Sequence, residues 1–297
     1  MTMPRYEIKK LNKMVCEVRV YLKKGEKDFN IFISPDHHWD NPKCDRKLLK
    51  KHLDEALQTE ALIVMPGDTF CLMQGKWDPR RSKKDIRPEH NVHNYLDAVI
   101  NDAIEWYKPY SKNMILGNGN HETAILKNLE TDVLERFAGG MGRAVPVMGY
   151  HGWVMIKIIE TNSGKVNNVL NLYFHHGYGG GGAVTRGQIS MSRHMMAVEN
   201  ADIISQGHIH EKSNTEVMMH YLDTSPSSNK AKIKSVLLVQ SSTYKQEYTE
   251  GGFHIEKGRP AKPLGGVFIN VEQVRDENGS RKLIKKAMFY GTQTIDL

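Results

Sequence analysis

Short apolar runs in this chain repeatedly lead into motifs of Asp, His and Asn, and this repetition limits the possible fold more than any other feature. Runs 31–33, 62–65, 114–116 and 170–174 each precede such a motif, and the shorter run 203–204 precedes a fifth. Apolar runs of this length suit strands that are covered on both faces. In open α/β sheets, ligands gather beyond the carboxyl ends of the strands. We therefore expect the five motifs to meet at one edge of one sheet.

The five motifs contain the residue types that bind divalent metal ions. They read Pro35-Asp36-His37-His38, Gly67-Asp68, Gly119-Asn120-His121-Glu122, His175-His176-Gly177 and Gly207-His208-Ile209-His210. Carboxylate, imidazole and amide oxygen together suit a borderline ion such as Mn, Fe, Zn or Ni. The donors are too many for one tetrahedral ion and sufficient for two ions that share a carboxylate. Two metals about 3.5–4 Å apart form the clamp used for in-line displacement at phosphorus.

Two of the motifs place potential ligands two residues apart. In an extended backbone such side chains point the same way, so Asp36 and His38 should reach one ion. The same spacing should aim His208 and His210 at one place. His37 would point away from Asp36 and His38, and we interpret it as a spacer.

The order of these motifs resembles the signature of the calcineurin-like metallophosphoesterases, and the match runs from about residue 36 to residue 210. The resemblance implies an α/β, four-layer sandwich in which two mixed β-sheets are flanked by helices, with a dinuclear metal site at the strand ends. It implies seven metal ligands: Asp36, His38, Asp68, Asn120, His176, His208 and His210. The implied cofactors are two divalent metal ions, Mn²⁺ first, with Fe, Zn or Ni as alternatives.

The resemblance also divides the ligands between the two ions. One ion would be held by Asp36, His38 and His210, and the other by Asn120, His176 and His208. Asp68 would bridge them and, with His121, form the catalytic pair.

Three residues beside these ligands have alternative interpretations. The resemblance gives His121 a hydrogen bond to the phosphoryl or leaving oxygen, as electrostatic stabiliser or general acid. Glu122 either orients His121 or favours the positive end of the helix that begins there. Because adjacent strand residues face opposite ways, only one of His175 and His176 is expected to be a ligand. The family pattern favours His176, and His175 is the alternative.

Cys71 departs from the family pattern, which often has another polar residue three positions beyond the Asp of the second motif. The departure does not affect the bridging role of Asp68. It leaves open what lines the pocket beside that carboxylate.

Candidate substrate-binding residues lie in two loops. Residues 72–94 form a basic insertion without helical or strand period, and such long loops are functional or disordered. In one interpretation this loop is a lid in which Arg80 and Arg81 grip phosphates through bidentate contacts and Trp77 offers a stacking face. In the other it is a solvated charged loop.

The second of these loops is rich in glycine. Tyr178 precedes the four glycines 179–182, which expose backbone N–H groups and allow a substrate to approach closely. Arg186 follows them and could reach a phosphate. Tyr178 and Arg186 therefore complete the set of substrate-binding candidates.

The remaining pattern predicts the framework of the fold. Strands at 14–22 and 29–34 are expected to form a hairpin that opens the sheet. A hairpin of 152–160 with 165–174 is expected to start a second sheet. Three later strands should complete that second sheet: 236–240, 266–271 and 282–290. Helices are expected over four segments: 44–59, 94–107, 122–137 and 185–198.

Composition bounds the class of protein. At 297 residues the chain is expected to be a single metallophosphoesterase domain, 1–297, with the basic insertion at about 72–94. No apolar run approaches the roughly 20 residues that span a bilayer, so no membrane contact is expected. The N-terminal residues lack the apolar core of a secretion signal, and three widely spaced cysteines suit a reducing compartment. We expect a cytoplasmic protein.

The net charge of +7 favours polyanionic partners. The predicted function is therefore a metal-dependent phosphoesterase that cleaves phosphodiester bonds by attack of a metal-activated hydroxide, with nuclease action on DNA or RNA as its specific form. The alternatives are a phosphomonoesterase acting on proteins or nucleotides and a non-catalytic, metal-stabilised binding module. A phosphate-ester substrate, including nucleic acid, is the expected partner.

Overall fold

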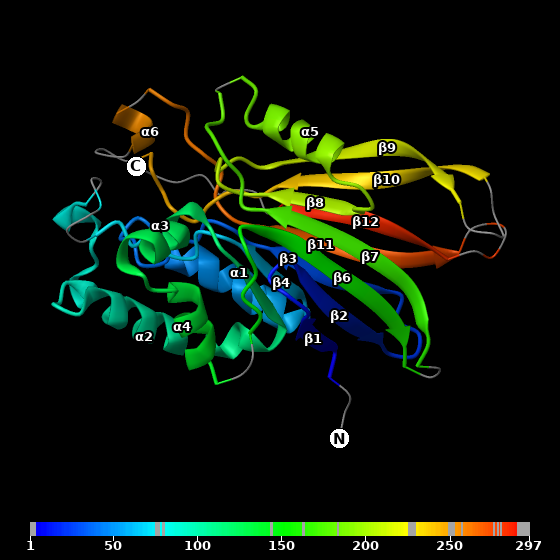
Figure 1. The fold of residues 1–297 in the computed structure, drawn as a ribbon, viewed down its shortest axis with the longest axis horizontal. Coiled ribbons are helices and arrows are strands. Elements are labelled where there is room, and N and C mark those ends of the chain that lie inside the picture. The colour runs from blue at the N-terminus through cyan, green and yellow to red at the C-terminus, as the bar shows by residue number, and fades with distance from the viewer. Residues whose placement is uncertain are drawn as a thin grey trace.

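The computed structural model of the chain describes residues 4–74, 78, 81–142, 145–161, 164–182, 184–224, 230–248, 253–256, 258–275, 277, 279 and 281–289. Two mixed sheets pack face to face, and helices cover both outer faces of the pair (Figure 1). This α/β, four-layer sandwich confirms the predicted fold class. No helix in these ranges is both long and apolar enough to cross a bilayer.

The larger sheet has seven strands in the order β1-β2-β6-β7-β8-β10-β9. Their bounds are β1 Tyr6–Lys10, β2 Val15–Leu22, β6 His151–Glu160, β7 Val166–His175, β8 Ile203–Gln206, β9 Ser213–Asp223 and β10 Lys230–Gln240. The predicted hairpin is present, since β6 pairs antiparallel with β7. β8 lies parallel to both β7 and β10, so these three strands end at the same edge.

The smaller sheet has five strands in the order β12-β11-β3-β4-β5. Their bounds are β3 Asp28–Ile33, β4 Leu62–Pro66, β5 Met114–Gly117, β11 Val267–Arg275 and β12 Arg281–Phe289. β3, β4 and β5 are parallel to one another and likewise share an exit edge.

Two predicted strand pairings are wrong. β2 and β3 do not form a hairpin, because β2 pairs with β1 and β6 in the larger sheet while β3 pairs with β4 and β11 in the smaller one. A short polar turn serves equally well to cross between two stacked sheets, so its composition does not distinguish the two connections. β11 and β12 belong with β3 in the smaller sheet and not with β10, because an apolar strand pattern does not reveal which of two stacked sheets the strand joins.

The core has two principal layers, and β3 shows how the sequence produces both. Ile31 and Ile33 pack between the two sheets, whereas Phe32 packs on the opposite face under the helices. A strand whose successive side chains enter different cores must be apolar at every position. The uninterrupted apolar runs therefore mark the central strands that lead to the motifs.

Among the described residues, four helices cover the outer face of the smaller sheet and one covers that of the larger sheet. Their bounds are α1 Arg46–Gln58, α2 Tyr95–Tyr107, α3 Asn120–Leu129, α4 Val133–Gly140 and, on the larger sheet, α5 Gln188–Ala197; a short helix, α6, spans Phe253–Glu256. The predicted helix 122–137 is two helices, because Glu130 has a left-handed backbone and Asp132 caps α4 by accepting a hydrogen bond from the Glu135 N–H.

Candidate metal centre

The five motifs meet at one end of the sandwich. β3, β4 and β5 of the smaller sheet and β7 and β8 of the larger sheet each end at a motif. Asp36 Oδ2 accepts a hydrogen bond of 2.8 Å from the His208 backbone N–H, which joins the two sheets at this end. The motifs therefore converge as predicted, but at the shared end of two sheets and not at the edge of one. Packing of the sheets adds the imidazoles of β7 and β8 to the carboxylates of β3 and β4.

One group of potential ligands contains Asp36, His38 and His210. One donor atom from each lies within 4.8 Å of the other two. His210 Nε2 is 3.4 Å from Asp36 Oδ1. Asp36 and His38 are buried, so the charge of an ion held here would be poorly screened by solvent.

A second group contains Asp68, His176 and His208, whose donor atoms also lie within 4.8 Å of one another. Asn120 joins it, with Oδ1 3.0 Å from His176 Nε2. Asp68 Oδ2 is 3.4 Å from His176 Nε2 and 4.0 Å from His38 Nε2 of the first group. Asp68 therefore lies between the groups, where a bridging carboxylate would be needed.

The backbone reaches this arrangement in a way that the sequence did not predict. The five residues concerned have left-handed φ values: Asp36 56°, His38 46°, Asp68 48°, His208 66° and His210 58°. The prediction of an extended backbone at both i, i+2 pairs is wrong. Left-handed backbone costs a non-glycine residue on the order of 1 kcal/mol or more. These five are half of the ten described non-glycine residues with positive φ, so strain is concentrated at this site.

A glycine lets the two sheets approach at the first group. A Cβ on Gly207 would lie 2.5 Å from Asp36 Oδ2 and 2.7 Å from Pro35 Cβ. Asp36 would then have to move away from the position where it faces His210.

We expect Gly207→Ala to weaken Mn²⁺ binding by about 10- to 100-fold, the range found when support around a metal ligand is removed. Competition with a fluorescent chelator would measure the affinity. Gly139→Ala is the matched control, because a Cβ there meets nothing within 4 Å. Unchanged affinity in Gly207→Ala would show that Asp36 is not held by this close approach.

The protonation pattern of the donors fits a bound cation. His176 Nδ1 is 3.0 Å from the Pro66 carbonyl oxygen, which can only accept, so Nδ1 carries the proton. The Nε2 lone pair then faces the oxygens of Asn120 and Asp68, and three electron-rich atoms require a positive charge between them. Burial disfavours a protonated ring, yet Asp68 raises the pKa of His176 to about 10. Either a proton or a metal ion meets this demand.

The donors of the first group also fit a bound cation. His38 Nδ1 and Nε2 and Asp36 Oδ1 are buried without a hydrogen-bond partner among the described residues. Burial, followed by the neighbouring His121, holds the pKa of His38 well below its usual value, so its ring is neutral, the form that binds metals. Buried donors without partners are costly unless a ligand satisfies them. The residues therefore fit divalent metal ions.

His121 flanks both groups without belonging to either. Its backbone N–H donates to Asp68 Oδ1 at 3.0 Å, and its Nδ1 is 2.5 Å from the Cys71 carbonyl oxygen. Nδ1 therefore carries the proton, and Nε2 lies 3.8 Å from Asp68 Oδ2 on the side of the centre. His121 thus turns Nε2 toward Asp68, the carboxylate that lies between the two groups.

Glu122 has a role that neither sequence interpretation described in full. Its buried carboxylate accepts hydrogen bonds from the backbone N–H groups of Asp68, Phe70 and Gly119 at 2.9–3.1 Å. The bond to Gly119 caps the start of α3, as the helix-end interpretation implies. The other two bonds tie the loop after β4 to that helix, so Glu122 positions Asp68 through the backbone.

We expect Glu122→Ala to lower the free energy of unfolding by about 3 kcal/mol, because three backbone N–H groups lose their acceptor at roughly 1 kcal/mol or more each. Urea unfolding followed by circular dichroism would measure it. Glu199→Ala, at an exposed position, is the control and should change stability by less than about 0.5 kcal/mol. A loss of stability no larger than that of the control would show that Glu122 does not support the site.

His176, and not His175, lies among the clustered donors. The His175 ring packs 4.4 Å from the His194 ring, centroid to centroid, and its Nδ1 accepts a hydrogen bond from the Gly177 N–H. His37 also points elsewhere, since it hydrogen-bonds Ser34 and Tyr107 at 2.7 Å. The spacer interpretation of His37 agrees with this placement.

The substrate-binding candidates are placed unevenly. Arg80 and Trp77 lie outside the described residues. Arg81 and Arg186 have exposed side chains. Tyr178 is 44% exposed and its ring lies 5.4 Å from that of His194. Of these candidates, Tyr178 directly follows the fourth motif, His175-His176-Gly177, along the chain.

Sequence reasoning missed Lys245. Its side chain is 11% exposed, and Nζ is 2.7 Å from Glu247 Oε1. The preceding residue, Tyr244, donates its N–H to the Asp36 carbonyl oxygen. β10 runs parallel to β8, so the segment after it reaches the same end of the sandwich. The signal is that Lys245 follows the apolar end of β10, and the strand-end rule would find it if basic residues were considered together with Asp, His and Asn.

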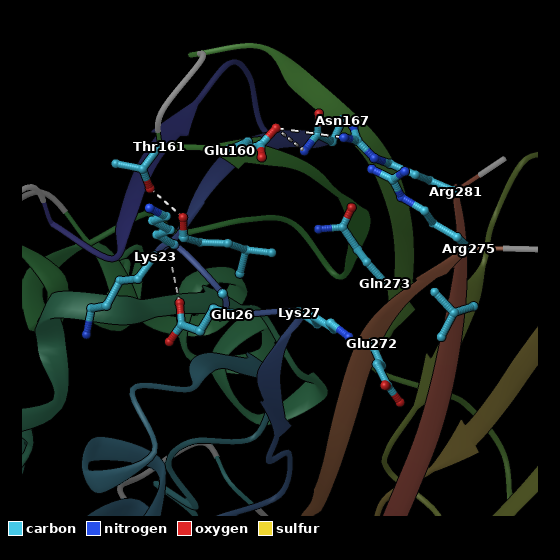
Figure 2. Close-up of a pocket in the computed structure, with 14 residues that line it drawn as sticks. Lys23, Glu26, Lys27, Glu160, Thr161, Asn167, Glu272, Gln273, Arg275 and Arg281 are labelled. Atoms are coloured by element: carbon cyan, nitrogen blue, oxygen red, sulfur yellow. Dashed lines mark hydrogen bonds and ion pairs between the residues drawn. The ribbon is translucent and has the colours of Figure 1, made fainter. Parts of the chain in front are cut away.

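A separate cavity lies away from this centre. It has a volume of about 500 Å³ and is lined by the turn after β2 and by parts of β6, β7, β11 and β12 (Figure 2). The turn 23–27 precedes β3, whereas the first motif follows that strand, so the cavity lies at the opposite end of the sandwich. Its walls mix Lys23, Lys27 and Arg275 with Glu26 and Glu272, which is not the donor set of a metal centre.

Comparison with known proteins gives a likeness of fold only. No protein-family model matches the chain, and no curated protein matches it. Vps29 from Chaetomium thermophilum is 10% identical, with a TM-score of 0.37 over 91% of this chain and 100% of that one. A candidate 5'-nucleotidase from Staphylococcus aureus in complex with alpha-ketoglutarate is 15% identical, with a TM-score of 0.40 over 91% of this chain and 56% of that one. Likenesses this remote do not bear on activity.

Proposed function

We propose that this chain is a metal-dependent phosphoesterase that hydrolyses phosphodiester bonds. The observation that carries the proposal is the pair of buried donor groups with Asp68 between them and His121 beside them. Mn²⁺ is the ion we propose first, because the donors combine carboxylate, amide oxygen and imidazole and the two groups contain no sulfur.

Two divalent ions at these groups would supply positive charge to the phosphoryl oxygens and would lower the pKa of a bound water. The chain's own residues do the remaining work. Asp36, His38 and His210 hold one position, and Asn120, His176 and His208 hold the other. Burial of these donors excludes water that would otherwise screen the charges.

His121 and Lys245 act on the substrate in this proposal. His121 presents Nε2 toward the space beside Asp68, where in its protonated form it donates a hydrogen bond or a proton to the leaving oxygen. Its Nδ1–H bond to the Cys71 carbonyl oxygen fixes the ring orientation for that transfer. Lys245 adds a positive charge near His38, which favours an anionic substrate.

Nucleic acid is the substrate class that we propose first. The chain carries a net charge of +7, and the basic insertion at about 72–94 follows the β4 exit loop that holds Asp68. A polyanion gains affinity from each phosphate that such a surface neutralises. Arg80, Arg81 and Arg186 would contact backbone phosphates, and Tyr178 would stack on a base.

The test is a set of parallel assays on purified protein loaded with Mn²⁺. The substrates are bis-p-nitrophenyl phosphate, p-nitrophenyl phosphate, and labelled single- and double-stranded DNA and RNA. Cleavage of the diester and of a nucleic acid ahead of the monoester is expected. Preference for the monoester would indicate a phosphatase. No hydrolysis of any substrate, with metal tightly bound, would indicate the non-catalytic binding module.

A further inference from the structure

A cysteine lies against the candidate metal centre. Cys71 Sγ and one ring nitrogen each from His38 and His121 lie within 4.8 Å of one another, and all three residues are buried. Asp40 fixes the position of this cysteine, because its carboxylate accepts hydrogen bonds from the backbone N–H groups of Cys71 and Leu72 at 2.5 and 2.9 Å. The sulfur is therefore held at the centre by the loop that also presents Asp68.

The two imidazoles of this group are in the form that binds a metal. His121 Nδ1 donates to the Cys71 carbonyl oxygen, which leaves the lone pair on Nε2 free to coordinate. His38 is only 2% exposed, and both of its ring nitrogens are buried without a hydrogen-bond partner among the described residues. An unpartnered buried imidazole beside a thiol is costly unless a ligand occupies the space.

Burial raises the pKa of the free Cys71 thiol to about 12, although Lys245 opposes this, so a bound cation would have to stabilise the thiolate. Asn41 Nδ2 donates a hydrogen bond to Cys71 Sγ at 3.4 Å. Hydrogen bonds of this kind from outside the ligand set stabilise a coordinated sulfur. Lys245, held by Glu247, brings a positive charge toward the same side of the centre.

We propose that His38, Cys71 and His121 form a further cation position, selective for thiophilic divalent metals such as Zn²⁺, Cd²⁺ and Co²⁺. On binding, the Cys71 S–H bond breaks, its proton passes to solvent, and the sulfur electron pair forms the bond to the metal, with no change of oxidation state. Mn²⁺ favours oxygen donors and does not take this position. His38 belongs to both this group and the Asp36 group, so occupation of the two positions is competitive.

If the chain has the proposed function, a metal ion bound at this position would affect hydrolysis at the centre. A metal bound through His121 Nε2 removes that nitrogen from the substrate. Zn²⁺ would therefore inhibit hydrolysis supported by Mn²⁺, and it would do so less in a chain without Cys71. The geometry itself does not depend on hydrolysis and is tested separately.

Titration of the metal-free protein with Co²⁺ tests the site by absorption spectroscopy. A thiolate-to-cobalt charge-transfer band in the near ultraviolet is expected in the wild type and in Cys44→Ser, which removes another buried thiol that is in none of the donor groups. The band should be lost in Cys71→Ser, and the Zn²⁺ dissociation constant of that variant should rise at least about tenfold. Visible d–d bands without a charge-transfer band, or a band that persists in Cys71→Ser, would overturn the proposal.

Cadmium NMR of the wild-type protein gives a second test that needs no variant. A resonance in the range of sulfur-ligated cadmium is expected, and resonances only in the range of nitrogen and oxygen ligation would contradict the site. Assays of Mn²⁺-supported hydrolysis on the same preparation separate the two proposals. Sulfur ligation without hydrolysis would support this metal position and contradict the phosphoesterase. Hydrolysis without sulfur ligation would support the phosphoesterase and contradict this metal position.

Discussion

Replacement of Asp68 by Asn is expected to reduce diester hydrolysis by about 10³-fold or more. Asp68 Oδ2 lies 3.4 Å from His176 Nε2, 3.8 Å from His121 Nε2 and 4.0 Å from His38 Nε2, so a single carboxylate faces both donor groups and the flanking imidazole. Burial alone would raise the pKa of Asp68, but His176 and His121 lower it well below its usual value, so the side chain is an anion. Asparagine keeps the shape and removes that charge.

The size of this effect follows from the loss of preorganised charge. Removal of a single neutral donor from an enzyme site costs about 10²–10³-fold in kcat, and a charge shared by two ions should cost at least as much. Steady-state kinetics with bis-p-nitrophenyl phosphate and elemental analysis would measure activity and metal content together. Asp97→Asn, at an exposed ion pair with Arg136, is the control. Activity above a tenth of wild type in Asp68→Asn would contradict the bridging role.

The second large effect is expected for His121→Ala, which should lower kcat by about 10²–10⁴-fold while leaving the Mn²⁺ content unchanged. His121 is outside both donor groups of the proposed Mn²⁺ centre, so its removal takes away no ligand of either ion. His220→Ala, at an exposed position on β9, is the matched control.

The choice of leaving group separates the two roles that His121 could have. If His121 donates a proton, diesters with poor leaving groups should lose more rate in His121→Ala than p-nitrophenyl esters lose. An equal loss for all leaving groups would indicate electrostatic stabilisation without proton transfer. Loss of Mn²⁺ in this variant would show instead that His121 is a ligand of the centre.

The meeting of the motifs was predictable because it depends on a local signal. Each central strand is an unbroken apolar run, and the residues after it must lie at the strand's exit. Parallel strands in one layer share that exit, so Asp36, Asp68 and Asn120 had to be neighbours. The imidazoles of β7 and β8 were expected at the same edge, and they reach it from the second sheet.

Other features could not be read from the sequence. A turn between two strands does not reveal whether it returns within one sheet or crosses to another, which is why β2 and β3 were wrongly paired. Left-handed backbone at Asp36 and His208 depends on hydrogen bonds to distant segments, such as that from the Asp36 N–H to the Gly67 carbonyl oxygen. The contacts of Glu122 and Lys245 likewise depend on tertiary packing.

Anomalous diffraction at the manganese absorption edge, on crystals of the Mn²⁺-loaded protein, would locate the ions of the proposed centre. Two manganese ions about 3.5–4 Å apart are expected, one between Asp36, His38 and His210 and the other beside His176 and His208. Asp68 should contact both ions. A fully loaded crystal with no manganese at these residues, or with a single ion that Asp68 does not touch, would contradict the proposed centre.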